Sequence, residues 1–279
     1  MNRMLSQKIM DIVFTVSGAI TLLILALVIG YILINGLPAI DMEFIFSKSS
    51  DAGRSGGIFP MIVSTIYLIV ISISIAVPIG VGSAVYVSEY ARDLRVINLS
   101  KFVSEVLASV PSIVFGLFGF SFFIMFLKLD WSIFTGGLVL ALMSVPTIFQ
   151  ISEVTLQSIP DNVREASMGL GASKWQTITE VVFPLAIPGI ATGIILALTR
   201  AISEAAAVMY VVGSSLDVPT SMFDAGRPLP LHLYVLASEA ISMENAYGTA
   251  AVLIIMVLAI TLAVNFIINR YQLKMGVLK

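Results

Sequence analysis

The chain of 279 residues is 58% hydrophobic and only 11% charged, and its mean hydropathy is +1.02. Soluble domains carry far more charge on their surfaces, so this composition indicates an integral membrane protein. Cysteine is absent and histidine occurs once, which excludes thiol catalysis, disulfides and Cys/His metal sites. The net charge of −2, without a basic run, gives no indication of nucleic-acid binding.

Six stretches are apolar enough to cross a membrane, because about 20 apolar residues in a helix span the hydrocarbon core. In chain order they are Ile12–Ile34, Ile58–Ser88, Val106–Leu127, Trp131–Ser152, Leu185–Val212 and Ala246–Asn269. The first has 23 uncharged residues and no small-residue cleavage site after it, so we expect a helix and not a signal peptide. The pattern predicts an all-α integral membrane protein, a single domain over residues 1–279 with six transmembrane helices.

Lys and Arg are divided unevenly between the two sides that six spans define. One side receives ten of them: Arg3, Lys8, Arg92, Arg95, Lys101, Arg164, Lys174, Arg270, Lys274 and Lys279. The other side receives four: Lys48, Arg54, Lys128 and Arg227. Cytoplasmic loops of membrane proteins carry the excess of these residues, so the distribution predicts that both termini are cytoplasmic.

The third span contains "SVPSIVFGLFG", in which Pro111, Gly116 and Gly119 interrupt a helical pattern. Such residues are tolerated at membrane depth where other protein or a water-filled cavity satisfies the freed backbone groups. Tight helix packing on small residues explains Gly116 and Gly119 equally well. For Ser109 and Ser112 the position favours a substrate pathway.

Arg200 and Glu204 are charged residues inside the fifth span. In a helix from Leu185 to Val212, Arg200 would lie near the centre, roughly 22 Å along at about 1.5 Å per residue. A charge there costs about 3 kcal/mol or more and normally faces the bundle interior or a cavity. The i, i+4 spacing predicts either a structural ion pair or an anion stepping stone, in which Arg200 contacts the anion and Glu204 tunes that contact.

A charged segment, "SIPDNVREASMGLGASKWQTITEVVFPLAIPG", follows the fourth span. Capping boxes that begin at Ser158 and at Ser173 predict two short helices, and Gly171 between them can take the left-handed conformation. The second helix should end near Val182, two residues before Pro184. A solvated connector is the simpler interpretation, but two capped helices about a glycine form a rigid knob suited to another protein's groove.

This segment resembles the EAA loop of ABC-importer permeases, whose pattern is Glu-Ala-Ala, three residues, Gly, nine residues, Ile, one residue, Leu-Pro. The matching residues are Glu165, Ala166, Ser167, Gly171, Val181, Phe183 and Pro184. The resemblance implies the type I ABC-importer permease fold and a cytoplasmic coupling loop over residues 153–184. It implies that the first short helix docks on an ATP-hydrolysing subunit, with the coupling residues Arg164, Glu165, Ala166, Ser167, Gly171 and Pro184.

Three further stretches resemble the PstA-type permeases of bacterial phosphate importers: residues 56–91, residues 105–120 and "LTRAISEAA" at residues 198–206. That family more often has Gly-Glu-Thr where this chain has Ser203-Glu204-Ala205. The resemblance implies a permease subunit that is not itself an enzyme, moving inorganic phosphate across the bacterial cytoplasmic membrane.

The resemblance also implies the other parts of the system. They are a PstC-like second permease, a PstB-like ATPase dimer that binds ATP and Mg²⁺, and a PstS-like phosphate-binding protein. The permease contacts membrane lipid, holds no cofactor or metal of its own, and binds no nucleic acid. Its outer segments, residues 35–57 and 213–245, should meet the binding protein.

Other functions stay open. An importer for molybdate, sulfate or phosphonate would share the same spans and loop. An ion channel has no need for the EAA spacing, and an intramembrane enzyme would need convergent acid, base or nucleophile groups. The stretch "GLGASK" lacks the P-loop spacing. His232 is expected to be an ordinary loop or interfacial histidine rather than a catalytic one.

Overall fold

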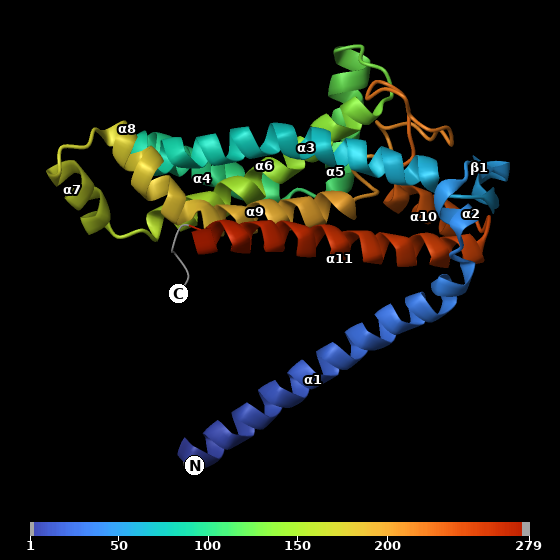
Figure 1. The fold of residues 1–279 in the computed structure, drawn as a ribbon, viewed down its shortest axis with the longest axis horizontal. Helices are drawn as coiled ribbons and strands as arrows, with labels where there is room; N and C mark the ends of the chain where they lie inside the picture. Colours follow the sequence, from blue (N-terminus) through green and yellow to red (C-terminus); the bar gives the residue numbers. More distant parts are fainter. Residues whose placement is uncertain (1–2, 275–279) are drawn as a thin grey trace.

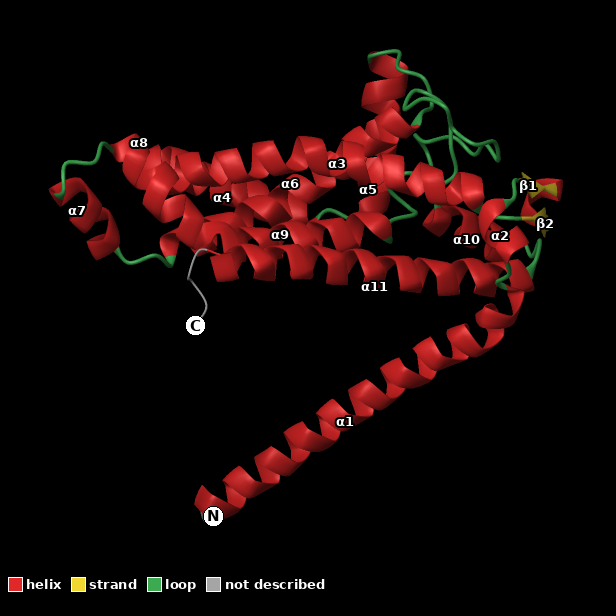
Figure 2. Ribbon diagram, in the orientation of Figure 1, coloured by secondary structure: helices red, strands yellow, loops and turns green. Residues whose placement is uncertain are grey.

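The structure is a computed structural model, and its described residues are 3–274 (Figures 1 and 2). Lys279, one of the cations counted above, lies outside the described residues. The helices, short turns and strands in chain order are α1 (Arg3–Gly36), η1 (Leu37–Ala39), α2 (Met42–Phe46), β1 (Ser49–Ser50), η2 (Asp51–Gly53), β2 (Ser55–Gly56), α3 (Phe59–Val85), η3 (Tyr86–Tyr90), α4 (Leu94–Ser109), α5 (Ser112–Gly119), η4 (Phe120–Phe126), α6 (Ile133–Gln157), α7 (Asp161–Gly169), α8 (Lys174–Gln176), η5 (Thr177–Val182), α9 (Phe183–Ile202), α10 (Leu229–Ser238) and α11 (Met243–Lys274).

The body of the protein is a bundle of long helices with α6 at its centre. Helix α6 packs against α3, α4 and α9, and α11 lies beside α9 and α10 (Figure 1). Leu140, Ile148 and Leu156, spaced along α6, are all fully buried. Within residues 3–274, five helices are long and apolar enough to cross a membrane, and the number is six when a bent pair of helices is counted as one span.

That bent pair replaces the single helix that we predicted for the third span. Helix α4 begins at Leu94 and ends at Ser109, α5 begins at Ser112, and the two meet at 99°. Pro111 has no N–H to donate and restricts the residue before it, so Val110 becomes extended with ψ 130°. The charged segment before the span is therefore helical, and the break occurs within the predicted span.

The fifth span also differs from the predicted helix. It begins earlier, because α8, η5 and α9 run on without interruption from Lys174, and it ends at Ile202 instead of Val212. Residues 203–212 form turns, and among them Ala207, Val208, Val211 and Val212 are fully buried. Irregular backbone at this depth is stable because it packs inside protein.

Helix α1 diverges from the bundle and is exposed along its apolar length (Figure 1). Its end is joined to α11, where the Tyr31 ring packs edge-on against the ring of Tyr247 at 5.8 Å. The segment that follows contains α2 and a two-stranded antiparallel hairpin, β1–β2, in which Ser49 pairs with Gly56. An exposed apolar face of this length needs lipid or another protein chain to cover it.

His232 is not the loop or interfacial residue that we expected. It lies in α10 and is 1% exposed. Helix α10 is a short apolar helix that packs on α3 and α11, so its histidine turns inward beneath the η2 turn.

Candidate functional site

Helices α7 and α8 project from one end of the bundle, remote from the β1–β2 hairpin (Figure 1). Helix α7 begins at Asp161, and Pro160 before it is extended with ψ 142° and provides no side-chain cap. The capping box that we predicted at Ser158 is wrong. Its hydroxyl donates instead to the carbonyl of Thr155 at 2.7 Å, because Ser158 still belongs to the end of α6.

The turn between α7 and α8 follows the prediction. Gly171 has φ +93°, the left-handed conformation that favours glycine. Ser173 begins the second helix with a capping box: its Oγ accepts from the N–H of Gln176 at 3.3 Å, and the Gln176 Oε1 accepts from the N–H of Ser173 at 2.9 Å. The two helices are therefore held at a defined angle about Gly171.

The second short helix does not end near Val182 as predicted. A π-helical turn, η5, carries it directly into α9, and the N–H of Phe183 bonds to the carbonyl of Ile178, five residues back. Pro184 lacks an N–H and its ring would clash with a carbonyl four residues earlier in a regular helix. The wider π turn removes that clash, so Pro184 lies within a continuous helix and transmits the position of α8 rigidly to the membrane.

Arg164 holds α7 to the rest of the protein. Its guanidinium donates to both carboxylate oxygens of Glu89 in η3, with the shortest bond at 2.7 Å from Nη2. It also donates to the carbonyls of Leu156, at 2.9 Å, and Ile159, at 2.7 Å. One side chain thus joins α7 to the ends of α3 and α6.

Arg164 is protonated at this joint. Hydrogen bonds with Glu89 raise the pKa of Arg164 above its usual value, opposed by burial and aided by the charges of Glu89 and Asp161. The Glu89 side chain is 5% exposed and that of Arg164 is 16% exposed. A carboxylate buried to this extent is stable only while its partner is present.

A second contact joins α7 to η5. The hydroxyls of Ser167 and Thr177 lie 3.0 Å apart, within hydrogen-bond distance. Ser167 is the residue that replaces the second alanine of the EAA pattern, and this bond is a physical reason for a hydroxyl there. Together with Arg164, it fixes the inner face of α7.

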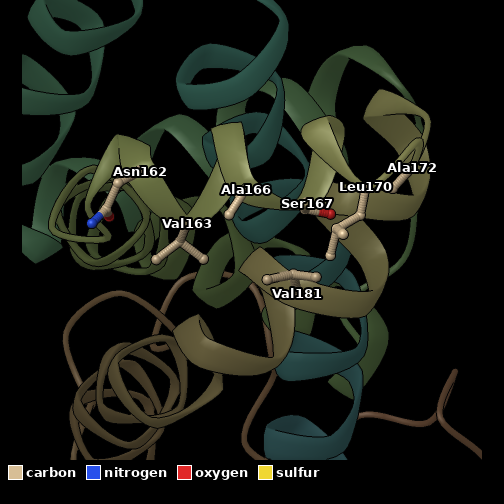
Figure 3. Close-up of a pocket in the computed structure, with 7 residues that line it drawn as sticks. All are labelled: Asn162, Val163, Ala166, Ser167, Leu170, Ala172 and Val181. Atoms are coloured by element: carbon tan, nitrogen blue, oxygen red, sulfur yellow. The ribbon is translucent and has the colours of Figure 1, made fainter.

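The side of α7 that faces η5 is open and largely apolar. A hollow of about 580 Å³ lies between α7 and η5 (Figure 3), lined by Asn162, Val163, Ala166, Ser167, Leu170, Ala172 and Val181. Leu170 at its rim is 91% exposed, and Glu165 on α7 is also exposed. Exposed apolar groups around a hollow mark a protein contact surface.

The predicted coupling residues therefore differ in exposure. Arg164 and Ser167 point inward and fix α7, whereas Glu165 and Ala166 are exposed on it. Gly171 forms the hinge.

The predicted pathway residues lie in two other places. Ser109 and Ser112 flank the break between α4 and α5, where the Ser109 hydroxyl donates to the carbonyl of Val106 at 2.7 Å. Arg200 lies in the last turn of α9 and is exposed on this chain. Within residues 3–274, no hydrogen bond or ion pair joins the two places.

The ion pair predicted between Arg200 and Glu204 is not formed in the described part of the chain. Helix α9 ends between them, and the Glu204 Oε1 accepts instead from the N–H of Ala207 at 3.1 Å. In a continuous helix that N–H would bond to the carbonyl of Ser203, so the carboxylate replaces a helical hydrogen bond. Spacing of i and i+4 predicts a contact only where the helix is unbroken.

Two buried carboxylates were missed from the sequence. Glu89 is the partner of Arg164, and Glu153 in α6 binds Lys101 of α4 at 3.2 Å. Each is an acidic residue at the end of an apolar span, and that position in the sequence can indicate a buried ion pair. Their partners are distant in the sequence, so the sequence alone does not identify them.

We predict that Arg164→Gln frees α7 from the bundle, because it leaves the Glu89 carboxylate buried without a counter-charge, at a cost of about 3–5 kcal/mol. Amide hydrogen exchange over residues 161–169 should become faster than in the parent protein. Asp161→Asn is the matched control, since that carboxylate is 89% exposed and 3.4 Å from the guanidinium. Equal exchange in the parent and in Arg164→Gln would contradict the anchoring role.

Comparison with known proteins gives consistent results. Residues 76–277 match the family "Binding-protein-dependent transport system inner membrane component". The chain is 33% identical to the probable ABC transporter permease protein YqgI of Bacillus subtilis, over 96% of each chain. It is 36% identical to the phosphate transport system permease protein PstA 1 of Mycobacterium tuberculosis, over 77% of this chain and 72% of that one.

Solved structures show the same fold at low sequence identity. A bacterial ABC transporter involved in the import of the polysaccharide alginate superposes with a TM-score of 0.66 at 15% identity, over 96% of this chain and 99% of that one. The MetNI methionine ABC transporter superposes with a TM-score of 0.59 at 20% identity, over 77% of this chain and 94% of that one. The chain therefore belongs to the family of binding-protein-dependent transport system inner membrane components, as a multi-pass permease subunit, not itself an enzyme, with the type I ABC-importer fold.

Proposed function

We propose that this chain is the permease subunit of an ATP-driven importer that carries inorganic phosphate into the bacterial cytoplasm. Relatives named as phosphate permeases support the cargo: those of Mycobacterium tuberculosis and Haemophilus influenzae are 36% and 28% identical over 77% and 88% of this chain. The single structural observation that carries the proposal is the exposed guanidinium of Arg200, in a helix that crosses the membrane.

Arg200 is placed where a transported anion would meet it. Helix α9 ends well short of the far ends of α3 and α11 (Figure 1), so its last turn lies at a depth that other membrane helices pass through. A charge at that depth does not face lipid, because the cost is several kcal/mol. A guanidinium presents a planar fork of donors that matches the oxygens of a tetrahedral oxyanion.

The same exposure supports the need for a second permease. This chain leaves Arg200 on its surface and α1 without a covering partner along most of its length. A PstC-like subunit would cover Arg200, and the proposed pathway then runs between the two chains, past Arg200 and the serines at the α4–α5 break. The pathway residues of this chain are then Arg200, Ser109 and Ser112.

The projecting helix α7 is the proposed contact with a PstB-like ATPase. Its exposed side combines the Glu165 carboxylate, the small Ala166 side chain and the apolar tip at Leu170. Arg164 fixes its other side to α3 and α6, so a force applied to α7 reaches the membrane helices. ATP and Mg²⁺ are bound by the ATPase, and this chain needs no cofactor.

The orientation follows from this contact. With α7 in the cytoplasm, both termini are cytoplasmic, and the β1–β2 hairpin and the segment after α9 face outward. These outer segments are the proposed docking face for a PstS-like phosphate-binding protein. The membrane is the bacterial cytoplasmic membrane, where lipid covers the outer apolar faces.

Gly171→Val tests the coupling role of the α7–α8 turn. A β-branched residue is strongly disfavoured at φ +93°, although the space around Gly171 is open. We expect normal insertion into the membrane and loss of the ATPase during co-purification. Gly169→Val is the matched control, because it too has open space but ordinary helical φ. Full ATPase retention in Gly171→Val with wild-type uptake would contradict the coupling role.

Single cysteines test the orientation in this cysteine-free chain. Asn98→Cys, exposed on α4, should resist a membrane-impermeant thiol reagent added outside intact cells, whereas Asp217→Cys, exposed in the outer segment, should react. The reverse pattern would show that the topology is inverted.

Arg200→Lys tests the anion contact, because lysine keeps the charge and loses the planar fork. We expect a raised KM for phosphate uptake with Arg200→Lys and a loss of most uptake with Arg200→Gln. Both variants should assemble normally, since within residues 3–274 Arg200 makes no ion pair or side-chain hydrogen bond. Arg95→Gln, an exposed arginine at the start of α4, is the control and should leave uptake unchanged. Normal phosphate uptake by Arg200→Gln would remove this residue from the pathway.

Competing anions separate phosphate from related cargoes. Excess molybdate, sulfate or phosphonate should leave phosphate uptake unchanged. Preferential uptake of one of these anions, with the same dependence on Arg200, would reassign the cargo.

A further inference from the structure

A glutamate side chain bonds to the backbone directly after the break in the fifth membrane segment. The Glu204 carboxylate accepts the N–H of Ala207 at 3.1 Å, at the first turn after α9. Ser203 closes the end of α9 from the other side, since its hydroxyl donates to the carbonyl of Thr199 at 3.1 Å. Glu204 thus caps the new turn in the way that an acidic side chain caps a helix start.

The capped turn lies directly against α5. A Cβ placed on Gly116 would lie 2.9 Å from the carbonyl oxygens of both Ala206 and Ala207. Backbone therefore approaches backbone at this point, with no space for even a methyl group. Behind the contact, Val208 and Phe115 belong to the same buried apolar cluster.

Arg200 depends on this contact for its position. It lies in the last turn of α9, two residues before the helix ends at Ile202. The direction of the Arg200 guanidinium therefore depends on where α9 ends and on how that end packs against α5. The Glu204 carboxylate itself forms no ion pair with Arg200 in the described part of the chain, and one of its oxygens is engaged by Ala207.

We propose that Glu204 is a positioning residue for transport: its carboxylate acts through the turn at residues 204–207, which holds the end of α9 against Gly116 of α5. Its role is to accept a hydrogen bond and not to tune the anion with its charge. The expected effect of Glu204 on uptake rests on the proposed function, with its anion pathway at Arg200. The hydrogen bond from Ala207 to Glu204 is independent of that proposal.

Three variants separate the cap from the charge. Glu204→Gln retains an oxygen that can accept the N–H of Ala207 but removes the charge. Glu204→Ala removes both, and Gly116→Ala disturbs the same contact from the α5 side. The experiment measures the KM and maximal rate of phosphate uptake by the assembled transporter in proteoliposomes.

We expect Glu204→Gln to keep a maximal rate within about twofold of the parent, and Glu204→Ala to lower it roughly fivefold, the factor that corresponds to the stability typically lost with a helix cap. Gly116→Ala should resemble Glu204→Ala, and Gly82→Ala, where nothing lies within 4 Å, should match the parent. An equal change of KM in Glu204→Gln and Glu204→Ala would overturn the proposal, because it would assign the effect to the charge.

A second measurement does not depend on the cargo. Val208→Cys places a thiol at a position that is 0% exposed, behind the capped turn. In the assembled transporter this thiol should stay unreactive with the parent Glu204 and with Glu204→Gln, and should become reactive with Glu204→Ala. Protection in Glu204→Ala would overturn the proposal even if phosphate is transported. If phosphate is not the cargo, uptake is absent from every variant and from the parent, while the thiol still reports on the cap.

Discussion

Wherever the backbone leaves a regular helix inside this bundle, its N–H and C=O groups have to find partners within the protein, because hydrocarbon offers none. The start of α6 shows how this is done: the N–H groups of Ile133 and Phe134 donate to the carbonyls of Asp224 and Met222. The Trp131 indole donates to the carbonyl of Tyr210 at 3.1 Å, and the N–H of Ser132 to that of Val211 at 3.1 Å. The irregular segment after α9 is thus bonded to the first turn of the central helix.

This constraint explains why the breaks occur where they do. Pro111 interrupts the third crossing, and the backbone there finds partners nearby: the N–H of Val110 donates to the carbonyl of Leu107 at 3.3 Å, and the carbonyl of Pro111 accepts the N–H of Val114 at 3.0 Å. The Glu204 carboxylate interrupts the fifth crossing at the level of the same α5 helix. The turn after the second break therefore packs on Gly116 of α5, the helix that begins after the first break, and Arg200 lies near the end of α9. Broken helices at a shared depth are a recurrent feature of transporter pathways.

At the end of the bundle from which α7 projects, the Arg164 guanidinium makes this helix rigid. Without it, α7 would be joined to the bundle by two short connections, the Ser167–Thr177 contact and the packing of Val163 on a buried apolar cluster. With it, α7, η3 and the end of α6 form one unit. The π turn at η5 completes the connection, because α8 continues into α9 without a break. A movement at α7 is therefore transmitted to three membrane helices at once.

The sequence predicted the parts of this structure that local chemistry decides. Long apolar runs gave the membrane helices, Gly171 gave the hinge, and Ser173 gave a capping box that the structure confirms. The helix end at Ile202 was missed because it depends on the Glu204 side chain, which bonds to the backbone three residues ahead. In addition, the sequence is apolar on both sides of the break, so its hydropathy does not mark the helix end. The Arg164–Glu89 joint was missed because the partners are far apart in the chain. The roles of Arg200, Ser109 and Ser112 stay predictions.

Phosphate transport by this chain, driven by an ATPase, can be measured as ATP-dependent accumulation of radiolabelled phosphate. The proteoliposomes contain this chain, its partner permease and the ATPase, with the binding protein supplied. We expect accumulation that requires ATP and is lost when this chain is omitted. Accumulation of another anion under the same conditions, with none of phosphate, would contradict this expectation.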